Sequence, residues 1–257
     1  MKVITIIQAR MGSSRLPGKN GMEVWRGLTL TELVLARTTR SMLSGRTVLA
    51  IPDTQKDDVL IPSAEMYGVD VFRGSENDVL GRFIGAMDKF GKCFGVKYLR
   101  EADYIVRVSA DNPFIDPARI DELITFFDFV QPCDYATNMV ISGYPDGVGA
   151  EIVTPETLYR IADDLTNVDE KTRAYHREHV LTWIQNNPEY RSRICMAPID
   201  KVRPHYRIDI DYQEDLNFVR ALAKDLPEKS APYWTTEEII KTLDANPELL
   251  KLRKMRD

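Results

Sequence analysis

The chain opens with an apolar segment that leads directly into a basic, glycine-containing loop. Residues 3–7 (Val-Ile-Thr-Ile-Ile) have the β-branched composition of a buried strand, and the loop follows over residues 8–19. Ligands of α/β proteins bind at the sheet edge where parallel strands end. A first strand of this kind favours an α/β fold with a ligand site directly after residue 7.

The loop carries side chains suited to an anion. Three cations, two hydroxyls and two glycines lie within ten residues: Arg10, Arg15, Lys19, Ser13, Ser14, Gly12 and Gly18. Cations and closely approaching backbone N–H groups are what a polyphosphate requires. The loop is therefore predicted to hold a nucleoside triphosphate. The simpler alternative is a solvated basic loop whose glycines only make turns.

Neither common phosphate-binding motif fits this loop. A Walker P-loop has four residues between its glycines and Ser or Thr after its lysine. Here five residues separate Gly12 from Gly18, and Asn20 follows Lys19. The Gly-x-Gly-x-x-Gly pattern of dinucleotide-binding proteins is missing as well. A triphosphate site here must therefore belong to another class.

Composition indicates a globular protein kept in a reducing compartment. The 257 residues are 44% hydrophobic and 28% charged, and the apolar runs are too short to span a membrane. No export signal is recognised at the N-terminus. Cys93, Cys133 and Cys195 have neither metal nor disulfide spacing. We expect a cytoplasmic chain with no membrane insertion.

Charge is unevenly distributed. The net charge is −5, which argues against nucleic acid as a partner. Residues 1–50 contain eight Lys or Arg against two Glu, a balance of +6 that leaves −11 for the remainder. A basic segment on an acidic body indicates a local anion site.

Strand and helix patterns alternate along the chain. Predicted strands cover residues 3–7, 47–51, 69–72, 104–108, 151–153 and 207–210. Predicted helices cover residues 29–43, 57–67, about 120–127, 156–164, 170–186 and 216–226, and Ser75 is a predicted helix N-cap. The alternation predicts an α/β fold, a mostly parallel sheet covered by helices on both faces. One domain over residues 1–257 is expected.

Several motifs resemble one family. They occupy residues 7–19, 72–80, 107–116, 144–147, 177–180 and 210–216, in family order along most of the chain. With these motifs the chain resembles the cytidylyltransferases that make CMP-activated sugars, the acylneuraminate and CMP-Kdo synthetases. The most similar branch is that of spore-coat polysaccharide protein F, which begins with a nearly identical Ile-Gln-Ala-Arg-Met-Gly-Ser-x-Arg-Leu-Pro-Gly-Lys.

The resemblance implies a Rossmann-like, GT-A-like nucleotidyltransferase fold and a reaction. CTP and a sugar acid or related anionic acceptor would give a CMP-activated product and pyrophosphate, with Mg²⁺ as cofactor, in surface polysaccharide synthesis. It also implies a homodimer, with an excursion around residues 138–150 used for dimerisation. Transfer of another nucleotide, a glycosyltransferase on the same fold, and a catalytically silent nucleotide-binding subunit remain alternatives.

The resemblance also implies roles for individual residues. Asp111 and Asp211 would bind Mg²⁺, and Arg15 and Lys19 would act with them in catalysis. The nucleotide-binding residues would be Gln8, Ala9, Arg10, Gly12, Ser13, Ser14, Arg15, Lys19, Ser75, Asp78 and Arg82. The acceptor-binding residues would be Tyr144, Asp146, Glu151, Arg177 and His179.

Position alone leaves alternatives for the two aspartates. Asp111 follows a predicted strand and precedes Asn112, so it also suits a turn cap, and Asp211 suits a helix N-cap. Mg²⁺ takes one or two carboxylates together with phosphate oxygens. The two carboxylates, a hundred residues apart, can share one ion only if both segments end at the same sheet edge.

Two features depart from the family pattern, and one pair of histidines raises the question of a zinc site. The stretch 91–100 is longer than in relatives and is expected to be a surface elaboration. Asp209 is a further carboxylate on the face of Asp211, expected to pair with Arg207 or Arg203. His176 and His179 have no Cys or third His nearby and do not form a His-Glu-x-x-His pattern, so zinc is not expected.

Overall fold

The computed structural model describes residues 2–91, 102–185 and 187–253. Within these ranges one sheet has the strand order β5-β4-β1-β6-β8-β7-β9, and all of its strands except β8 run in one direction. The predicted mostly parallel sheet is confirmed. Its strands are β1 (Val3–Gln8), β4 (Arg46–Pro52), β5 (Asp70–Gly74), β6 (Tyr104–Ser109), β7 (Tyr135–Thr137), β8 (Glu151–Val153) and β9 (Ser192–Ile194).

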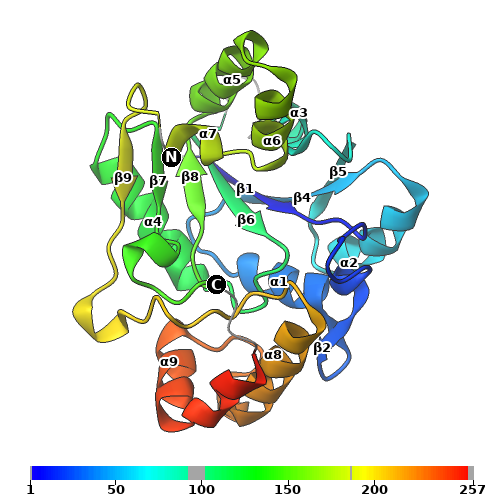
Figure 1. Cartoon of the computed structure of the whole chain (residues 1–257), viewed down its shortest axis with the longest axis vertical. Helices are drawn as coiled ribbons and strands as arrows, with labels where there is room; N and C mark the ends of the chain where they lie inside the picture. The colour runs from blue at the N-terminus through cyan, green and yellow to red at the C-terminus, as the bar shows by residue number, and fades with distance from the viewer. Residues whose placement is uncertain (1, 92–101, 186, 254–257) are drawn as a thin grey trace.

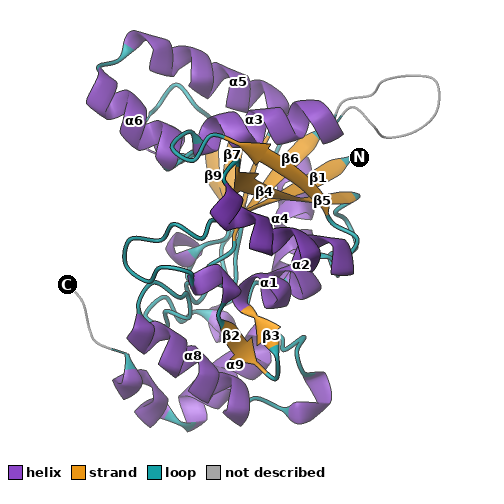
Figure 2. Cartoon of the chain, turned by 90° about the vertical axis from the view of Figure 1, so that its right-hand side faces the viewer, coloured by secondary structure: helices purple, strands orange, loops and turns teal. Residues whose placement is uncertain are grey.

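Helices cover both faces of the sheet, as Figures 1 and 2 show. One face carries α3 (Val79–Phe90), α5 (Pro155–Asp164), α6 (Glu170–Glu178) and α7 (Thr182–Gln185). The other carries α1 (Leu30–Thr38), α2 (Ile61–Met66) and α4 (Pro117–Phe129). Beyond these lie the hairpin of β2 (Glu23–Trp25) and β3 (Leu28–Thr29) and the helices α8 (Gln213–Asp225) and α9 (Thr236–Ala245).

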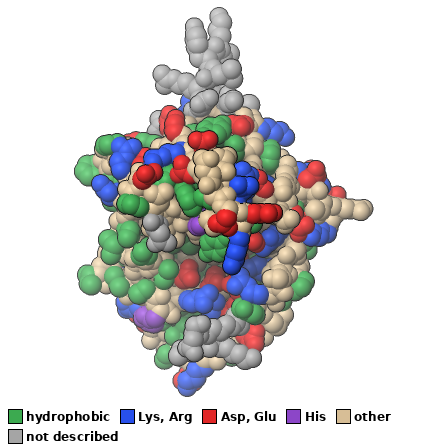
Figure 3. Space-filling view, turned by 45° about the horizontal axis from the view of Figure 1, so that its top comes forward, with side chains coloured by type: hydrophobic (Ala, Val, Ile, Leu, Met, Phe, Trp, Pro, Cys, Tyr) green, Lys and Arg blue, Asp and Glu red, His purple; other side chains and the backbone are tan. Residues whose placement is uncertain are grey.

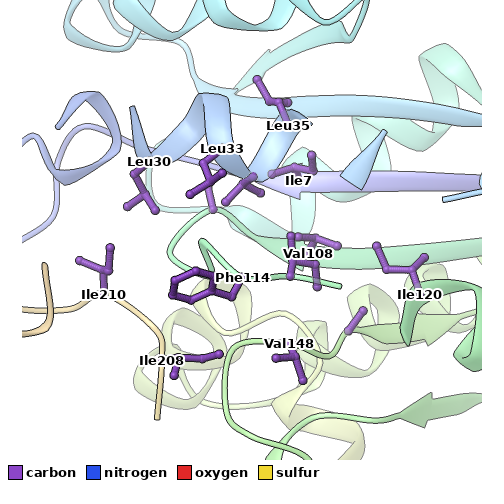
Figure 4. Close-up of a cluster of buried hydrophobic side chains, with 14 of the residues drawn as sticks. Ile7, Leu30, Leu33, Leu35, Val108, Phe114, Ile120, Val148, Ile208 and Ile210 are labelled. Carbon is purple, nitrogen blue, oxygen red and sulfur yellow. The ribbon is translucent and has the colours of Figure 1, made fainter. Parts of the chain in front are cut away.

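Each face of the sheet has its own buried apolar cluster. The larger cluster joins β1 and β6 to α1, α4, α8 and α9, and Figure 4 shows Leu33 of α1 and Phe114 pointing toward its centre. Ile208 and Ile210 pack into it from the irregular segment before α8. The smaller cluster lies under α3 and α5. Because strand residues alternate between faces, Ile6 belongs to the smaller cluster and Ile7 to the larger one.

Several predicted helices have different bounds. The first helix begins at its capping residue Thr29 as expected but ends at Thr38, and residues 57–67 form a 3-10 turn (Gln55–Leu60) followed by α2. The predicted cap Ser75 is wrong, because Asp78 caps α3 by accepting the N–H of Gly81 at 2.8 Å. The predicted helix 170–186 is two helices, because Val180 takes a φ of 44° between α6 and α7; residue 186 lies outside the described residues.

The last predicted strand is also wrong. Residues 207–210 form no strand; Arg207 makes one isolated bridge with Asp146, and the rest of the segment is irregular. Both edges of β6 are occupied, by β1 and β8, so no ladder is open to this segment beside it. Residues 92–100 of the stretch expected to be a surface elaboration lie outside the described residues.

Candidate active site

The loop after β1 is held by its own backbone and by side chains from other elements. The N–H of Gly18 donates to the carbonyl of Met11 at 3.0 Å, and Gly18 has a φ of 76° that suits glycine. The N–H of Met11 donates to Asp57 at 2.7 Å, and the Asn20 side chain donates to the carbonyl of Arg10 at 2.7 Å. The loop is therefore fixed before any ligand arrives.

Lys19 joins the two predicted metal-binding carboxylates. Its ammonium lies 3.3 Å from Asp111 Oδ2 and 3.1 Å from Asp211 Oδ1, and it donates to the carbonyl of Ile210 at 2.5 Å. Arg15 adds a second cation on Asp211, at 2.7 Å. The geometric expectation that Asp111 and Asp211 meet is confirmed, since both contact one ammonium.

The two aspartates are held differently. Asp111 is the second residue after β6, and its carbonyl accepts the N–H of Ile210 at 2.9 Å. Asp211 is not the N-cap of α8; that position is Tyr212, and the Asp215 carboxylate accepts the backbone N–H groups of Asp211 and Tyr212 at 3.0 and 2.9 Å. The backbone before α8 is thus fixed by a buried carboxylate.

A cleft of about 240 Å³ opens between the loop and the end of β6. Figure 3 shows cationic and acidic side chains gathered around a hollow in one face of the molecule. The predicted residues that line the cleft are Gln8, Ala9, Arg10, Ser13, Ser14, Arg15, Lys19, Arg82, Asp111 and His179. Strand ends explain the gathering, because Gln8 of β1 and Ser109 of β6 are register partners. Phosphate-sized anions would meet at least four cations here.

Three predicted nucleotide-binding residues, Gly12, Ser75 and Asp78, lie outside the cleft lining, whereas Arg82 is part of it. Gly12 packs against the ion pair of Lys56 and Glu76, since a Cβ there would lie 2.7 Å from Glu76 Oε1. Arg82 is buried and donates to the carbonyls of Ser75 and Glu76. Burial, with the nearby charge of Arg10, lowers the pKa of Arg82 to about 10. An anion near these two guanidinium groups would relieve that repulsion.

Helix α6 reaches the nucleotide loop from the opposite side. Arg177 pairs with Asp78 at the start of α3, and Glu178 accepts from Arg10 at 2.9 Å. His179 follows as the C-cap and lines the cleft. Glu178 was not predicted as a cleft residue, although it stands between two residues that were.

Four of the five predicted acceptor-binding residues lie outside the cleft lining: Tyr144, Asp146, Glu151 and Arg177. Tyr144 is fully buried, with its hydroxyl held by Arg119 and Glu122. Glu151 is 2% exposed and pairs with Arg107, which itself lines the cleft. Burial places Tyr144 in the core, and Glu151 acts on the cleft through its partner.

Asp146 lies near Asp111 but outside the cleft lining. Its carboxylate is 3.6 Å from Arg207, and its backbone accepts the N–H of Ile208 at 2.9 Å. Burial, followed by the nearby charge of Asp209, raises the pKa of Asp146 to about 6. Asp209 pairs with Arg207 at 3.1 Å as predicted, whereas Arg203 pairs with Asp244 instead.

Sequence reasoning missed three kinds of cleft residue. Arg107 lies on β6, the strand next to β1, and donates to Gln8 Oε1 at 3.1 Å. The alternation of side chains along the strand could have predicted this position. Ser109 and Ala110 line the cleft as the residues directly before Asp111. Asn20 and Val79 gave no sequence signal, because their roles depend on how the loop and α3 pack.

Comparison with known proteins decides the family. The profile described as "Cytidylyltransferase" matches residues 4–246. The chain belongs to the cytidylyltransferase family. It is a nucleotidyltransferase by this membership, and the matched residues include the loop after β1, Asp111 and Asp211.

One relative covers nearly the full length of this cytidylyltransferase, and a second covers 64% of it. The spore coat polysaccharide biosynthesis protein SpsF of Bacillus subtilis is 33% identical over 254 residues, covering 96% of this chain and 95% of the relative. The 8-amino-3,8-dideoxy-manno-octulosonate cytidylyltransferase of a Shewanella species is 29% identical over 164 residues, covering 64% and 62%. The predicted resemblance is confirmed.

Solved structures of similar fold support the same assignment. A cytidylyltransferase from Leptospira borgpetersenii has a TM-score of 0.83 at 27% identity, with all of both chains covered. A CMP:2-keto-3-deoxy-manno-octonic acid synthetase complexed with CTP has a TM-score of 0.60 at 17% identity, covering 87% of this chain and 99% of that one, and shows the shared fold. The nucleotidyltransferase fold of this cytidylyltransferase is thereby confirmed. Among its described residues, no helix has the length and apolar character to cross a bilayer.

Proposed function

We propose that this cytidylyltransferase transfers CMP from CTP to a hydroxyl of a sugar acid or related small anionic acceptor, releasing pyrophosphate, in surface polysaccharide synthesis. The observation that carries the proposal is the cleft lined by Arg10, Arg15, Lys19 and Asp111, with Asp211 held next to it by Arg15 and Lys19. Relatives named for spore coat polysaccharide biosynthesis and for an octulosonate cytidylyltransferase support the acceptor class.

The two aspartates suit a magnesium ion. Asp111 and Asp211 offer hard oxygen ligands beside a phosphate-sized cleft, and both already share one cation, the ammonium of Lys19. One or two carboxylates plus substrate phosphates is the usual donor set for Mg²⁺. When bound, Mg²⁺ would neutralise phosphate charge and orient the α-phosphorus. We therefore propose Asp111 and Asp211 as its protein ligands.

The chain's own residues would do the rest by positioning and charge. The acceptor hydroxyl attacks the α-phosphorus, and the bond from that phosphorus to the oxygen bridging to the β-phosphorus breaks. Arg15 and Lys19 stabilise the charge that gathers on the departing pyrophosphate, while Arg10 and Arg82 hold the nucleotide. Asp146, Arg177 and His179 are proposed to contact the acceptor, with Glu151 acting through Arg107 and Tyr144 supporting the pocket from the core.

Pyrophosphate release across CTP, UTP, ATP and GTP tests this proposal. The assay contains Mg²⁺ and a panel of acidic sugars and polyol phosphates, and Asp111→Asn is the matched control. Release that requires CTP and one acceptor, and that is lost in the control, is expected. Release with another nucleotide, consumption of a sugar nucleotide, or CTP binding with no release under any condition would each overturn it.

We also propose that residues 1–257 act as one nucleotidyltransferase domain that pairs with a second copy through the segment 138–150. Ile141 in that segment is 64% exposed, and Met196 and Ile199 beside it are 63% and 89% exposed. The N–H of Ala197 donates to the carbonyl of Ser142, which joins the two stretches. Sedimentation velocity should give a dimer, and Ile141→Asp should give a monomer; a wild-type monomer would contradict the proposal.

A further inference from the structure

Arg253 contacts the turn that carries Asp211 from a distant part of the sequence. Its Nε lies 3.0 Å from Asp215 Oδ1, its Nη2 lies 3.0 Å from Asp209 Oδ1, and its Nη1 donates to the carbonyl of Arg207. The Arg253 side chain is only 10% exposed. One guanidinium therefore binds both ends of the turn 207–215.

An ordered segment delivers this arginine. The 3-10 helix η7 (Pro247–Leu252) packs beside α8, as Figure 1 shows, and Leu249 is buried in the larger apolar cluster. The family profile ends at residue 246, so this segment lies outside the match. Motif comparison therefore gives no role to Arg253.

The contact with Asp215 leads to Asp211. Asp215 is fully buried, and its second oxygen accepts the backbone N–H groups of Asp211 and Tyr212. Burying a carboxylate is costly unless a cation or several hydrogen bonds compensate it, and the guanidinium of Arg253 lies 3.0 Å away. The position of Asp215, and with it the backbone of Asp211, thus depends on Arg253.

The contact with Asp209 restrains the other end of the turn. Asp209 also pairs with Arg207 at 3.1 Å, and the bridge between Arg207 and Asp146 is the turn's one β-type pairing within the described residues. The rigid, planar fork of a guanidinium holds several acceptors in fixed geometry, which a lysine ammonium does not. A side chain therefore helps to stabilise this turn, whereas other parts of the sheet edge are stabilised by ladders of backbone hydrogen bonds.

We propose that Arg253 is a positioning residue that sets the Asp211 carboxylate for the divalent cation and CTP, acting through Asp215 and Asp209. The inference rests on the proposed metal-binding role of Asp111 and Asp211. Arg253 itself contacts neither the cleft nor the reacting atoms.

Titration of Mn²⁺ in the presence of CTP, followed by electron paramagnetic resonance, tests the inference. The variants are Arg253→Ala, Arg253→Lys and, as a control in the same segment, Lys251→Ala, whose side chain is 73% exposed and pairs with Glu248. Loss of an outer partner of a metal ligand weakens affinity about tenfold, and that is the expected result for Arg253→Ala. Arg253→Lys should fall between Arg253→Ala and wild type, and Lys251→Ala should match wild type.

Asp211→Asn separates failure of the inference from failure of the proposed function. If Asp211→Asn binds Mn²⁺ as tightly as wild type, the proposed metal site and the inference both fall. If Asp211→Asn loses the ion while folded Arg253→Ala keeps wild-type affinity and kcat, only the inference falls. Thermal unfolding checks each variant; should Arg253→Ala be unfolded at the assay temperature, Arg253→Lys decides, and affinity equal to that of Lys251→Ala overturns the inference.

Discussion

Asp111 and Asp211 both contact the ammonium of Lys19 but are held by different means. Asp111 follows β6, a strand hydrogen-bonded on both sides by β1 and β8. Asp211 follows an irregular segment, held by Lys19 on the carbonyl of Ile210, by Asp215 on the backbone N–H of Asp211 and by Arg253. Asp111 is placed by a backbone ladder, whereas Asp211 is placed by isolated backbone hydrogen bonds together with buried polar side chains.

This difference has an energetic consequence. Backbone ladders depend little on the identity of any one side chain, whereas a buried ion pair leaves an uncompensated charge when one partner is removed. Substitutions far from the cleft should therefore disturb the position of Asp211 more than the position of Asp111. The predictions below test that asymmetry, beginning with the largest expected effect.

Removing either carboxylate should lower kcat by at least about 100-fold, because each would hold the cation that neutralises phosphate charge. Asp111→Asn and Asp211→Asn are compared by pyrophosphate release from CTP, with urea unfolding as the control. Asp211→Asn should also lower stability more, since Asp211 contacts both Lys19 and Arg15. Wild-type activity in Asp111→Asn would show that the metal assignment is wrong.

Lys19→Met should lower activity about 100-fold and destabilise the fold by about 3 kcal/mol, because it leaves two carboxylates without their shared cation. The Lys19 side chain is 9% exposed, whereas that of Arg15 is 51% exposed. Arg15→Met is the matched variant; it should lose activity with a stability change below about 1 kcal/mol. Equal destabilisation in urea would contradict the buried role of Lys19.

Asp215→Asn and Asp116→Asn compare the two sides directly. Both carboxylates are buried and accept backbone N–H groups at a helix start, Asp116 from Ala118 and Thr236. Each substitution should cost about 1–3 kcal/mol of stability. Only Asp215→Asn should also weaken Mn²⁺ affinity, about tenfold. Equal Mn²⁺ affinities in the two folded variants would contradict the predicted difference between Asp211 and Asp111.

Asp146, which contacts the segment before Asp211, should make the stability of the protein depend on pH. Burial raises the pKa of Asp146 from 3.8 to about 6, so the folded state binds its proton more tightly than the unfolded state. The free energy of unfolding should fall as pH rises from 4 to 6, by up to about 3 kcal/mol, and the penalty should persist above pH 6. Measured without CTP or metal, Asp146→Asn should lack this fall. If the free energies of unfolding of wild type and Asp146→Asn change in parallel with pH, this prediction is wrong.

The sequence predicted the Asp111 side better than the Asp211 side for a physical reason. Residues 104–108 are apolar and enter a ladder, so pattern and structure agree. Residues 207–210 also carry apolar residues that become buried, but both edges of β6 are already paired. Ile208 and Ile210 therefore lie outside any ladder and make only isolated backbone hydrogen bonds, to Asp146 and Asp111. Hydrophobic alternation reports burial and does not report whether a partner strand is available.

Long-range polar contacts account for most of what the sequence did not predict. The shared ammonium of Lys19 and the capping role of Asp215 depend on partners distant in the chain, which no local pattern encodes. The short strands β7 and β9 are three residues each, too short for a period to be recognised. The break at Val180 arises because the chain turns there to bury Val180 and Leu181.

A crystal of the protein soaked with CTP and MnCl₂ tests the central claim most directly, through the anomalous signal of manganese. The account predicts one strong anomalous peak in the cleft, coordinated by carboxylate oxygens of both Asp111 and Asp211 and by phosphate oxygens of CTP. A peak elsewhere in the cleft, or CTP bound with Lys19 as the one cation between the two carboxylates, would contradict it.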